Sequence, residues 1–289
     1  MLDISHLNKK YSRIFALKDI SLHMDEGDFM ICFGPDDAGK TALIYQLMGL
    51  HHFYDGEILF QGKDVRRLTT KEKKQIRFVP DSVCMENVTA RKYFRTLAKT
   101  YPDYQEEDVQ DMCEYFGVDM NCRLPEMTYN ENKLAMIIGA MVTNPKLLIL
   151  DEPFNFMTLE SGKKLLEFLK YLSSRGVSIL ITCTESKNVW EYCNKYMYMK
   201  DGSVVETGCV ADYLGVQKAI TLPVKEAALA QSLLGSPVAR RNDRVTFMYD
   251  KKIQSRSLME MLSLINASDV EIESLTLEEM IDKDYTRWM

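Results

Sequence analysis

The chain contains the stretch Gly34-Pro35-Asp36-Asp37-Ala38-Gly39-Lys40-Thr41, which fits the pattern G-x-x-x-x-G-K-[ST] of a phosphate-binding loop. The apolar run 29–33 before it predicts a buried parallel strand, and the residues after Lys40 predict a helix. A strand, a glycine loop and a helix start bring backbone N–H groups and the positive end of a helix dipole to a polyphosphate. We expect Lys40 to reach the β- and γ-phosphates of a nucleotide, and Thr41 to hold Mg²⁺ through its hydroxyl group.

Two carboxylates occupy the middle of this loop. Asp36 and Asp37 stand where a polyphosphate has to pass. Each carboxylate within about 5 Å of a phosphate costs roughly 1–3 kcal/mol at an effective dielectric constant of about 20–40, unless Mg²⁺ or solvent offsets it. Asp adopts a left-handed backbone more readily than most residues, but less readily than Gly. The loop is therefore expected to form and to bind ATP less tightly than a glycine-rich loop.

A second motif follows further along the chain, where the apolar run 147–150 ends in Asp151, Glu152 and Pro153. Adjacent carboxylates at the end of such a strand lie at the carboxyl edge of the sheet, beside the phosphate-binding loop. We expect Asp151 to orient Mg²⁺ and its waters. Glu152 is expected to orient or deprotonate the water that attacks the γ-phosphate.

Composition limits the class of protein. The 289 residues allow one large domain, alone or with a small appendage, and the net charge of −6 argues against nucleic acid as a main partner. No apolar run approaches the roughly 18 residues that a membrane span needs, and the first residues lack the pattern of a secretion signal. Seven scattered cysteines without a C-x-x-C pair indicate reduced thiols rather than disulfides or zinc ligands. We therefore expect a soluble, cytosolic chain.

The predicted elements divide the chain into two parts. Residues 2–31 are rich in strand patterns, and residues 88–142 are mostly helical. A shift in composition near Tyr213 separates a first domain, residues 1–212, from an appendage, residues 213–289. The appendage reads as strand, helix, strand, strand, helix, strand and a last helix, which resembles a small ferredoxin-like α+β fold. An irregular helical tail is the alternative interpretation.

Together these motifs resemble the nucleotide-binding subunit of an ABC transporter over residues 1 to about 212. Asp55-Gly56-Glu57-Ile58 after the first helix and Asn144-Pro145-Lys146 before the second motif add to this resemblance. It implies an α/β fold, namely a P-loop ABC ATPase domain with a RecA-like core, an N-terminal antiparallel β part and a helical subdomain at about 82–145. Residues 270–280 also look like the terminal segment of ABC-2-type exporter ATPases, which serve drug, bacteriocin and lantibiotic export or immunity.

The resemblance also assigns roles to single residues. Residues 34–41 would bind ATP together with Tyr11, Asp81 and Asp151, and Tyr11 would stack on the adenine. Thr41 and Asp151 would hold Mg²⁺, Asp151 through a water molecule. Glu152 would be the catalytic residue.

Several positions depart from the family's pattern. Asp81 aligns with the Q-loop glutamine, Thr158 with the D-loop aspartate and Thr184 with the switch histidine. The signature aligns with Thr128-Tyr129-Asn130-Glu131, which lacks both glycines, so the backbone cannot approach a γ-phosphate as closely. These departures imply weak ATPase activity of the chain alone.

The family's architecture implies the partners. Two subunits enclose two ATP molecules, each between the P-loop of one subunit and the signature of the other. A homodimer of this chain would have two poor sites, whereas an intact homologue would complete one good site, so the heterodimer is the preferred interpretation. The resemblance thus implies an integral membrane permease and a second ABC ATPase subunit as partners, and a peripheral position on the inner face of the cell membrane. The candidate docking residues are Val83, Met85, Val88, Tyr93 and Phe94. The equally weighted alternative is that these residues are simply the core of the helical subdomain.

Other classes of protein remain as alternatives or are excluded. A non-hydrolysing, regulatory or structural nucleotide-binding partner with an ABC fold is the second hypothesis. DNA-repair ABC ATPases need long heptad-repeat insertions, and translation-type ABC proteins need two cassettes, and the sequence has neither.

Overall fold

The computed structural model describes residues 1–11, 14–50, 55–101, 104–214, 216–266 and 269–283, with only the backbone of residues 11, 14 and 15. The chain forms two compact units. The first comprises Met1–Glu185 and Tyr192–Thr207, and the second comprises Ser186–Glu191 and Gly208–Met289.

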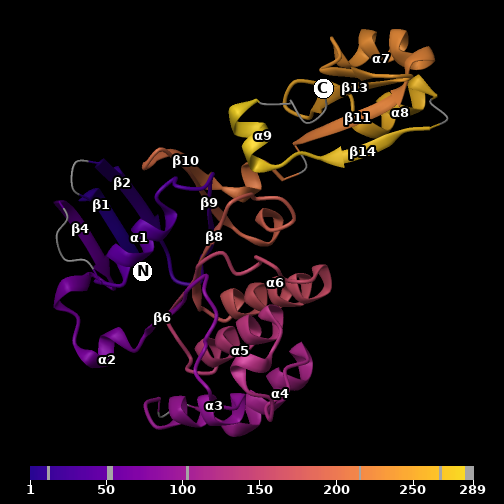
Figure 1. The fold of residues 1–289 in the computed structure, drawn as a ribbon. Coiled ribbons are helices and arrows are strands. Elements are labelled where there is room, and N and C mark those ends of the chain that lie inside the picture. The colour runs from indigo at the N-terminus through magenta and orange to yellow at the C-terminus, as the bar shows by residue number, and fades with distance from the viewer. Residues whose placement is uncertain (12–13, 51–54, 102–103, 215, 267–268, 284–289) are drawn as a thin grey trace. The chain divides into compact units, whose positions relative to one another are not determined.

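The first unit contains both strands and helices (Figure 1). They are β1 (Leu2–Tyr11), β2 (Ile14–Met24), β3 (Phe29–Phe33), α1 (Lys40–Leu47), β4 (Asp55–Phe60), β5 (Lys63–Asp64), α2 (Thr70–Lys73), β6 (Ile76–Val79), α3 (Ala90–Ala98), α4 (Glu106–Phe116), α5 (Tyr129–Met141), β7 (Leu147–Leu150), α6 (Leu159–Ser174), β8 (Ser178–Cys183), β9 (Lys195–Lys200) and β10 (Ser203–Cys209).

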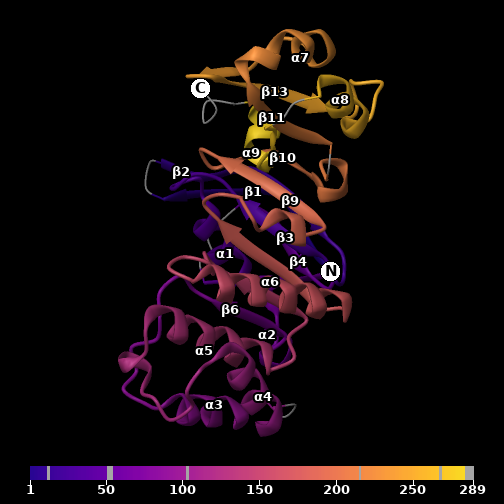
Figure 2. The same ribbon diagram turned by 90° about the vertical axis from the view of Figure 1, so that its right-hand side faces the viewer.

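A six-stranded sheet forms the centre of this unit, with the strand order β10-β9-β3-β8-β7-β6. The pairs β3–β9, β3–β8, β7–β8 and β6–β7 are parallel. Figure 2 labels β9, β3 and β6 of this sheet. Every residue of β3, β7 and β8 is buried, which explains their nearly continuous apolar sequences. Because these strands run in the same direction, their carboxyl ends meet at one edge of the sheet.

A smaller antiparallel sheet, β2-β1-β4-β5, packs against the same core. One hydrophobic cluster joins residues of this sheet, such as Ile4 and Ile58, to Leu43 and Ile44 of α1 and to Met30 of β3. The helix α1 is therefore held between the two sheets, with its first residue beside the carboxyl end of β3. This arrangement has the mainly parallel core and the N-terminal antiparallel part that the sequence predicts.

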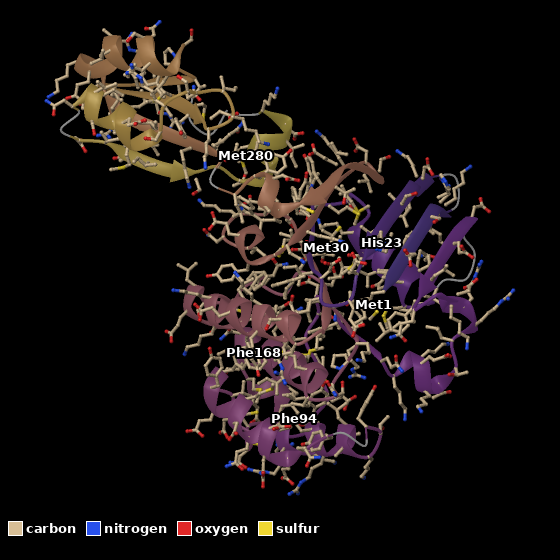
Figure 3. The ribbon with its side chains drawn as sticks, turned by 180° about the vertical axis from the view of Figure 1, so that it is seen from behind. Met1, His23, Met30, Phe94, Phe168 and Met280 are labelled. Carbon is tan, nitrogen blue, oxygen red and sulfur yellow. The ribbon has the colours of Figure 1, made fainter. Side chains whose placement is uncertain are left out.

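The helices α3, α4 and α5 follow β6 and form a helical part of the first unit (Figure 3). Phe94 on α3 is completely buried, and Phe168 on α6 packs against Phe116 of α4 with ring centroids 5.8 Å apart. Phe94 is therefore a core residue, and the expectation that it offers a docking contact is wrong, because its ring has no exposed surface. Met85, in contrast, is 69% exposed.

The second unit contains β11 (Gln217–Pro223), α7 (Ala227–Leu234), β12 (Ala239–Arg241), β13 (Arg244–Asp250), α8 (Leu258–Ile265), β14 (Glu271–Ser274) and α9 (Leu277–Asp282). Its sheet has the order β12-β13-β11-β14 with antiparallel neighbours. Ile220 of β11 and Phe247 of β13 form a core with Ala230 of α7 and Met261 of α8. This order, with one helix in each crossover, confirms the ferredoxin-like α+β fold.

The division between the two units differs from the boundary expected after residue 212. The compact units divide after Thr207, and the distant segment Ser186–Glu191 belongs to the second unit. The hydroxyl of Ser186 accepts a bond from the backbone N–H of Leu277 at 3.1 Å, and Ser186 also donates to Glu278. These bonds join residues far apart in the sequence, so no local pattern announces them.

None of the helices in the described part of the chain has both the length and the apolar composition that crossing a bilayer requires.

Candidate functional site

The loop between β3 and α1 has a conformation that only glycine permits at its two ends. Gly34 has a φ of 150°, and a Cβ atom there would lie 2.0 Å from the carbonyl oxygen of Met199. Gly39 has a φ of 100°, and a Cβ atom there would lie 2.7 Å from the carbonyl oxygen of Ala16. Both glycines are therefore required by close backbone contacts as well as by their dihedral angles.

The start of α1 has no side-chain cap on its first backbone donors. Gly39 caps the helix without a side-chain hydrogen bond, and the first turn contains no acidic residue. The first N–H groups of a helix have no acceptor within the helix, and they carry the positive end of its dipole. An anionic phosphate group is the natural acceptor at such a helix start.

A cavity of about 480 Å³ lies in front of this loop. Its lining residues are Ala16, Asp36, Asp37, Ala38, Gly39, Lys40, Thr41, Ala42, Asp81, Glu152, Asn155 and Thr184. The volume falls within the range of small-molecule sites. Most residues predicted for the nucleotide site thus line a single cavity, whereas Gly34, Pro35 and Asp151 are not among its lining residues.

Lys40 is held at the cavity by backbone carbonyls and by one carboxylate. Its Nζ donates to the carbonyl oxygens of Gly34 at 2.7 Å and Pro35 at 3.1 Å. The same atom lies 3.4 Å from Oε1 of Glu152, and the Lys40 side chain is only 7% exposed. The ammonium group therefore sits beside the loop amides, where a phosphate would gain both a charge and hydrogen bonds.

The buried Asp151 receives two hydroxyl donors. Thr41 Oγ1 donates to Oδ2 at 3.2 Å, and Thr182 Oγ1 donates to Oδ1 at 2.6 Å. The structure thus brings together the two residues predicted to hold Mg²⁺, and a hydroxyl and a carboxylate are the hard oxygen ligands that this ion prefers. Sequence reasoning missed Thr182, because its position follows only from the register that pairs Leu150 with Ile181.

Glu152 is fixed in a strained backbone conformation with a φ of 43°. Its backbone N–H donates to Thr182 Oγ1 at 3.0 Å. Its carboxylate accepts the backbone N–H of Thr184 at 3.1 Å and the Thr184 hydroxyl at 3.2 Å. These contacts hold the carboxylate at the cavity, next to Lys40.

Asp81 also lines the cavity and is tied to the helical part through Tyr129. Asn155 Nδ2 donates to Asp81 Oδ1 at 3.3 Å, and the hydroxyl of Tyr129 donates to the carbonyl oxygen of Asp81 at 2.6 Å. The backbone of Tyr11 ends β1 opposite Ile14, but its side chain lies outside the described part, so its predicted stacking on adenine stays a prediction.

The cavity carries an excess of negative charge. Four of its lining residues, Asp36, Asp37, Asp81 and Glu152, are carboxylates, and Lys40 is the only cation among the lining residues. Asp36 and Asp37 are exposed, and Asp37 has a φ of 63°. The Thr184 hydroxyl lies 3.4 Å from Oδ1 of Asp36. The residues therefore fit a polyphosphate best when a divalent cation accompanies it.

Comparison with known proteins assigns this domain. Residues 17–155 match the family model described as ABC transporter. A putative ABC transporter ATP-binding protein of Clostridium tetani is 30% identical over 223 residues, which cover 74% of this chain and 50% of the relative. The methionine import ATP-binding protein MetN of Clostridioides difficile is 21% identical over 294 residues, which cover 98% of this chain and 89% of the relative.

Solved structures share the fold. A bacterial ABC transporter cassette, described as dimeric, matches with a TM-score of 0.65 and 21% identity, over 73% of this chain and 99% of that one. The chain spans about half the length of the first curated relatives it matches, 50%, 44% and 45%. Because the matched residues 17–155 contain both phosphate-site motifs in the fold of such cassettes, this chain carries an ATP-binding domain of the ABC transporter family.

Proposed function

We propose that this chain is the ATP-binding subunit of a membrane ABC exporter, which binds Mg-ATP and couples nucleotide-driven dimerisation to a separate permease. The observation that carries the proposal is the convergence of Lys40, Thr41, Asp151 and Glu152 at one edge of the parallel sheet. These residues come from α1 and from the end of β7, more than a hundred residues apart in the sequence, and the fold alone brings them together.

Each of these residues has a defined task in the proposed site. The N–H groups at the start of α1 and the ammonium of Lys40 would hold the phosphates. Thr41 and, through water, Asp151 would hold Mg²⁺, which neutralises phosphate charge when bound. Glu152, fixed by Thr184 and Thr182, would orient the attacking water and accept its proton.

The proposed partner is a second ABC ATPase subunit with an intact signature. Thr128, Tyr129 and Asn130 begin α5 with side chains where the family has a serine and two glycines. A backbone with side chains at these positions approaches a γ-phosphate less closely than one with glycines. A heterodimer would combine this chain's P-loop with a better signature, and a homodimer would not.

The export direction and the membrane location are parts of the same proposal. Residues 270–280 support export through their resemblance to exporter ATPases, although MetN is named as an import protein. The proposed location is the cytoplasmic side of the cell membrane, docked to an integral membrane permease. The exposed Met85, at the edge of the helical part, is the candidate contact.

Purification of the tagged chain from detergent-solubilised membranes of its own cells tests the proposal. A permease and a second ATP-binding subunit are expected to co-purify with it. The variant Met85→Glu, folded by circular dichroism, is expected to lose the permease, whereas the same change at the exposed Met259 of α8 should not release it. Absence of any membrane protein from the wild-type preparation would favour the alternative of a soluble nucleotide-binding regulator.

Removing the two loop carboxylates is expected to tighten ATP binding. The double variant Asp36→Asn with Asp37→Gly should bind ATP about tenfold more tightly at low salt, and the gain should shrink as salt screens the repulsion. Glycine also relieves the left-handed backbone at position 37. Calorimetric titrations at several salt concentrations measure the effect. The control, Asp55→Asn with Glu57→Gln, removes two exposed carboxylates elsewhere and should change little; equal or weaker binding by the loop variant would give these carboxylates a favourable role.

The purified chain alone is expected to hydrolyse ATP more slowly than about 1 s⁻¹, the low end of ordinary enzymes. Glu152 can orient a water molecule, but Thr184 stands where the family has a γ-phosphate-sensing histidine. Thr184→His should raise turnover only modestly, because groups that act as a unit are not additive. Glu152→Gln is the control. It should remove the residual ATP turnover, because glutamine has nearly the size and shape of glutamate but cannot accept the proton of the water. ATP turnover by the wild-type chain alone at or above about 1 s⁻¹ would overturn the proposed weak activity. Absence of ATP turnover even in its membrane complex would favour the non-hydrolysing alternative.

A further inference from the structure

Lys133 on α5 is a buried lysine whose ammonium group binds only backbone oxygens. Its Nζ donates to the carbonyl oxygens of Pro80 at 2.5 Å, Asp81 at 2.9 Å and Asp151 at 3.2 Å. The residue has no exposed surface, and within the described part of the chain no carboxylate lies within 4.0 Å of the ammonium. Burial lowers the pKa of Lys133 to about 8, against the opposing effect of the nearby Asp81, Asp151 and Glu152 carboxylates.

The three carbonyl groups lie where two parallel strands separate. The pairing of β6 with β7 ends near Val79 and Leu150, and the last backbone bond runs from the N–H of Asp151 to the carbonyl of Val79 at 2.9 Å. Beyond this bond the carbonyls of Pro80, Asp81 and Asp151 lie outside the β6–β7 strand pairing. A lysine ammonium has three donors on one atom, and here it meets three acceptors.

Two other side chains of α5 hold the same loop but do not reach β7. The Tyr129 hydroxyl binds the carbonyl of Asp81. The Asn132 amide donates to the carbonyl of Cys84 at 2.8 Å and accepts the backbone N–H of Cys84 at 3.1 Å. Tyr129, Asn132 and Lys133 share one face of the helix because they are three and four residues apart. Of the three, Lys133 alone connects the loop to the strand that carries Asp151.

We propose that Lys133 is a positioning residue of the nucleotide site, which keeps the Asp81 loop and the Asp151 end of β7 at a fixed separation. Asp81 lines the cavity, and Asp151 accepts a hydrogen bond from Thr41, which lines it as well. Without the ammonium, the carbonyls of Pro80 and Asp151 would lose its hydrogen bonds, and the carbonyl of Asp81 would keep the bond from the Tyr129 hydroxyl. The tie between the Asp81 loop and the end of β7 would be lost, so the two would move apart to let water reach the freed carbonyls. The inference rests on the proposed binding of Mg-ATP, and it concerns the Mg²⁺-dependent part of that binding, since Asp151 is the residue that Lys133 fixes there.

The test compares Lys133→Met with Lys146→Met. Both changes replace a lysine by methionine close to β7, but Lys146 is exposed and pairs with Glu26 at 3.8 Å, away from the cavity. ATP binding is measured by calorimetry, once in EDTA and once over a series of Mg²⁺ concentrations. Lys133→Met should bind ATP in EDTA within about twofold of wild type, while its apparent affinity for Mg²⁺ in the ATP complex falls by about tenfold or more, as for groups that orient metal ligands. Lys146→Met should match wild type in both measurements.

A second variant separates positioning from folding. Lys133→Gln keeps two N–H donors, so its Mg²⁺ affinity should lie between those of wild type and Lys133→Met. If the methionine variant does not fold, the comparison of Lys133→Gln with wild type is the test. Unchanged Mg²⁺ affinity in a folded Lys133 variant overturns the inference, and so does an equal loss with and without Mg²⁺. Unfolding of both Lys133 variants would also overturn it, because the residue would then serve stability alone. Failure of the wild-type chain to bind ATP would instead overturn the proposed function itself.

Discussion

Lys40→Ala is expected to weaken ATP binding by about tenfold or more, because it removes a charge-assisted contact to the phosphates. The ammonium lies at the cavity wall with only 7% of its side chain exposed, so no other cation can replace it easily. The lining of the cavity contains no second lysine or arginine, and four carboxylates would then face the nucleotide unopposed. A calorimetric titration with Mg-ATP measures the loss.

The control for this variant is Lys63→Ala. Lys63 pairs with Glu72 at 2.8 Å on the surface, and its side chain is 42% exposed. Its loss should leave nucleotide affinity unchanged, since it does not line the cavity. Equal affinities of wild type and Lys40→Ala, with both proteins folded, would contradict the assignment of this cavity to phosphate binding.

Gly34→Ala is expected to destabilise the fold by about 3 kcal/mol or more, through backbone strain and a steric clash. The methyl group would stand 2.0 Å from the carbonyl oxygen of Met199, a backbone atom of the neighbouring strand β9 that cannot move without disturbing the sheet. The φ of 150° adds conformational strain for any residue with a side chain. Urea denaturation, followed by circular dichroism, measures the change in the free energy of unfolding.

Gly62→Ala provides the matched control. Gly62 also has a positive φ, 76°, but a Cβ atom there would meet nothing within 4 Å. It should therefore show the cost of the dihedral angle alone, about 1 kcal/mol. If the two variants lost equal stability, the contact with Met199 would be irrelevant, and the loop would be freer than the structure indicates.

The local sequence was sufficient to predict most of the residues that line the cavity beside α1. Residues 34–41 carry a spacing that needs two glycines and a lysine in a fixed order, and the apolar runs 29–33 and 147–150 identify the strands that end beside it. The order of elements after residue 213 was also sufficient to predict the ferredoxin-like fold. In each case the signal is contained in a few consecutive residues, because strand burial and tight turns impose local constraints on residue type.

The contacts of Thr182 and Lys133 could not be predicted in this way. Thr182 lies within an apolar strand and reads as an ordinary buried threonine, until the register of β7 with β8 sets it beside Asp151. Lys133 lies in a helix where a lysine is usually exposed, and its three carbonyl partners come from two other elements. For Phe94 the docking prediction was wrong, because the side chain is buried. An apolar residue in a helix does not by itself indicate whether it faces the core or a partner.

By itself, then, the sequence of this protein determined which strands and turns form and which residues stand at their ends. The tertiary structure decided which of these ends meet, because strand register and helix packing depend on contacts between residues far apart in the chain. Lys40 and Glu152 illustrate the difference, since each is recognisable from its own neighbours, yet their 3.4 Å approach exists only because β3 and β7 both pair with β8.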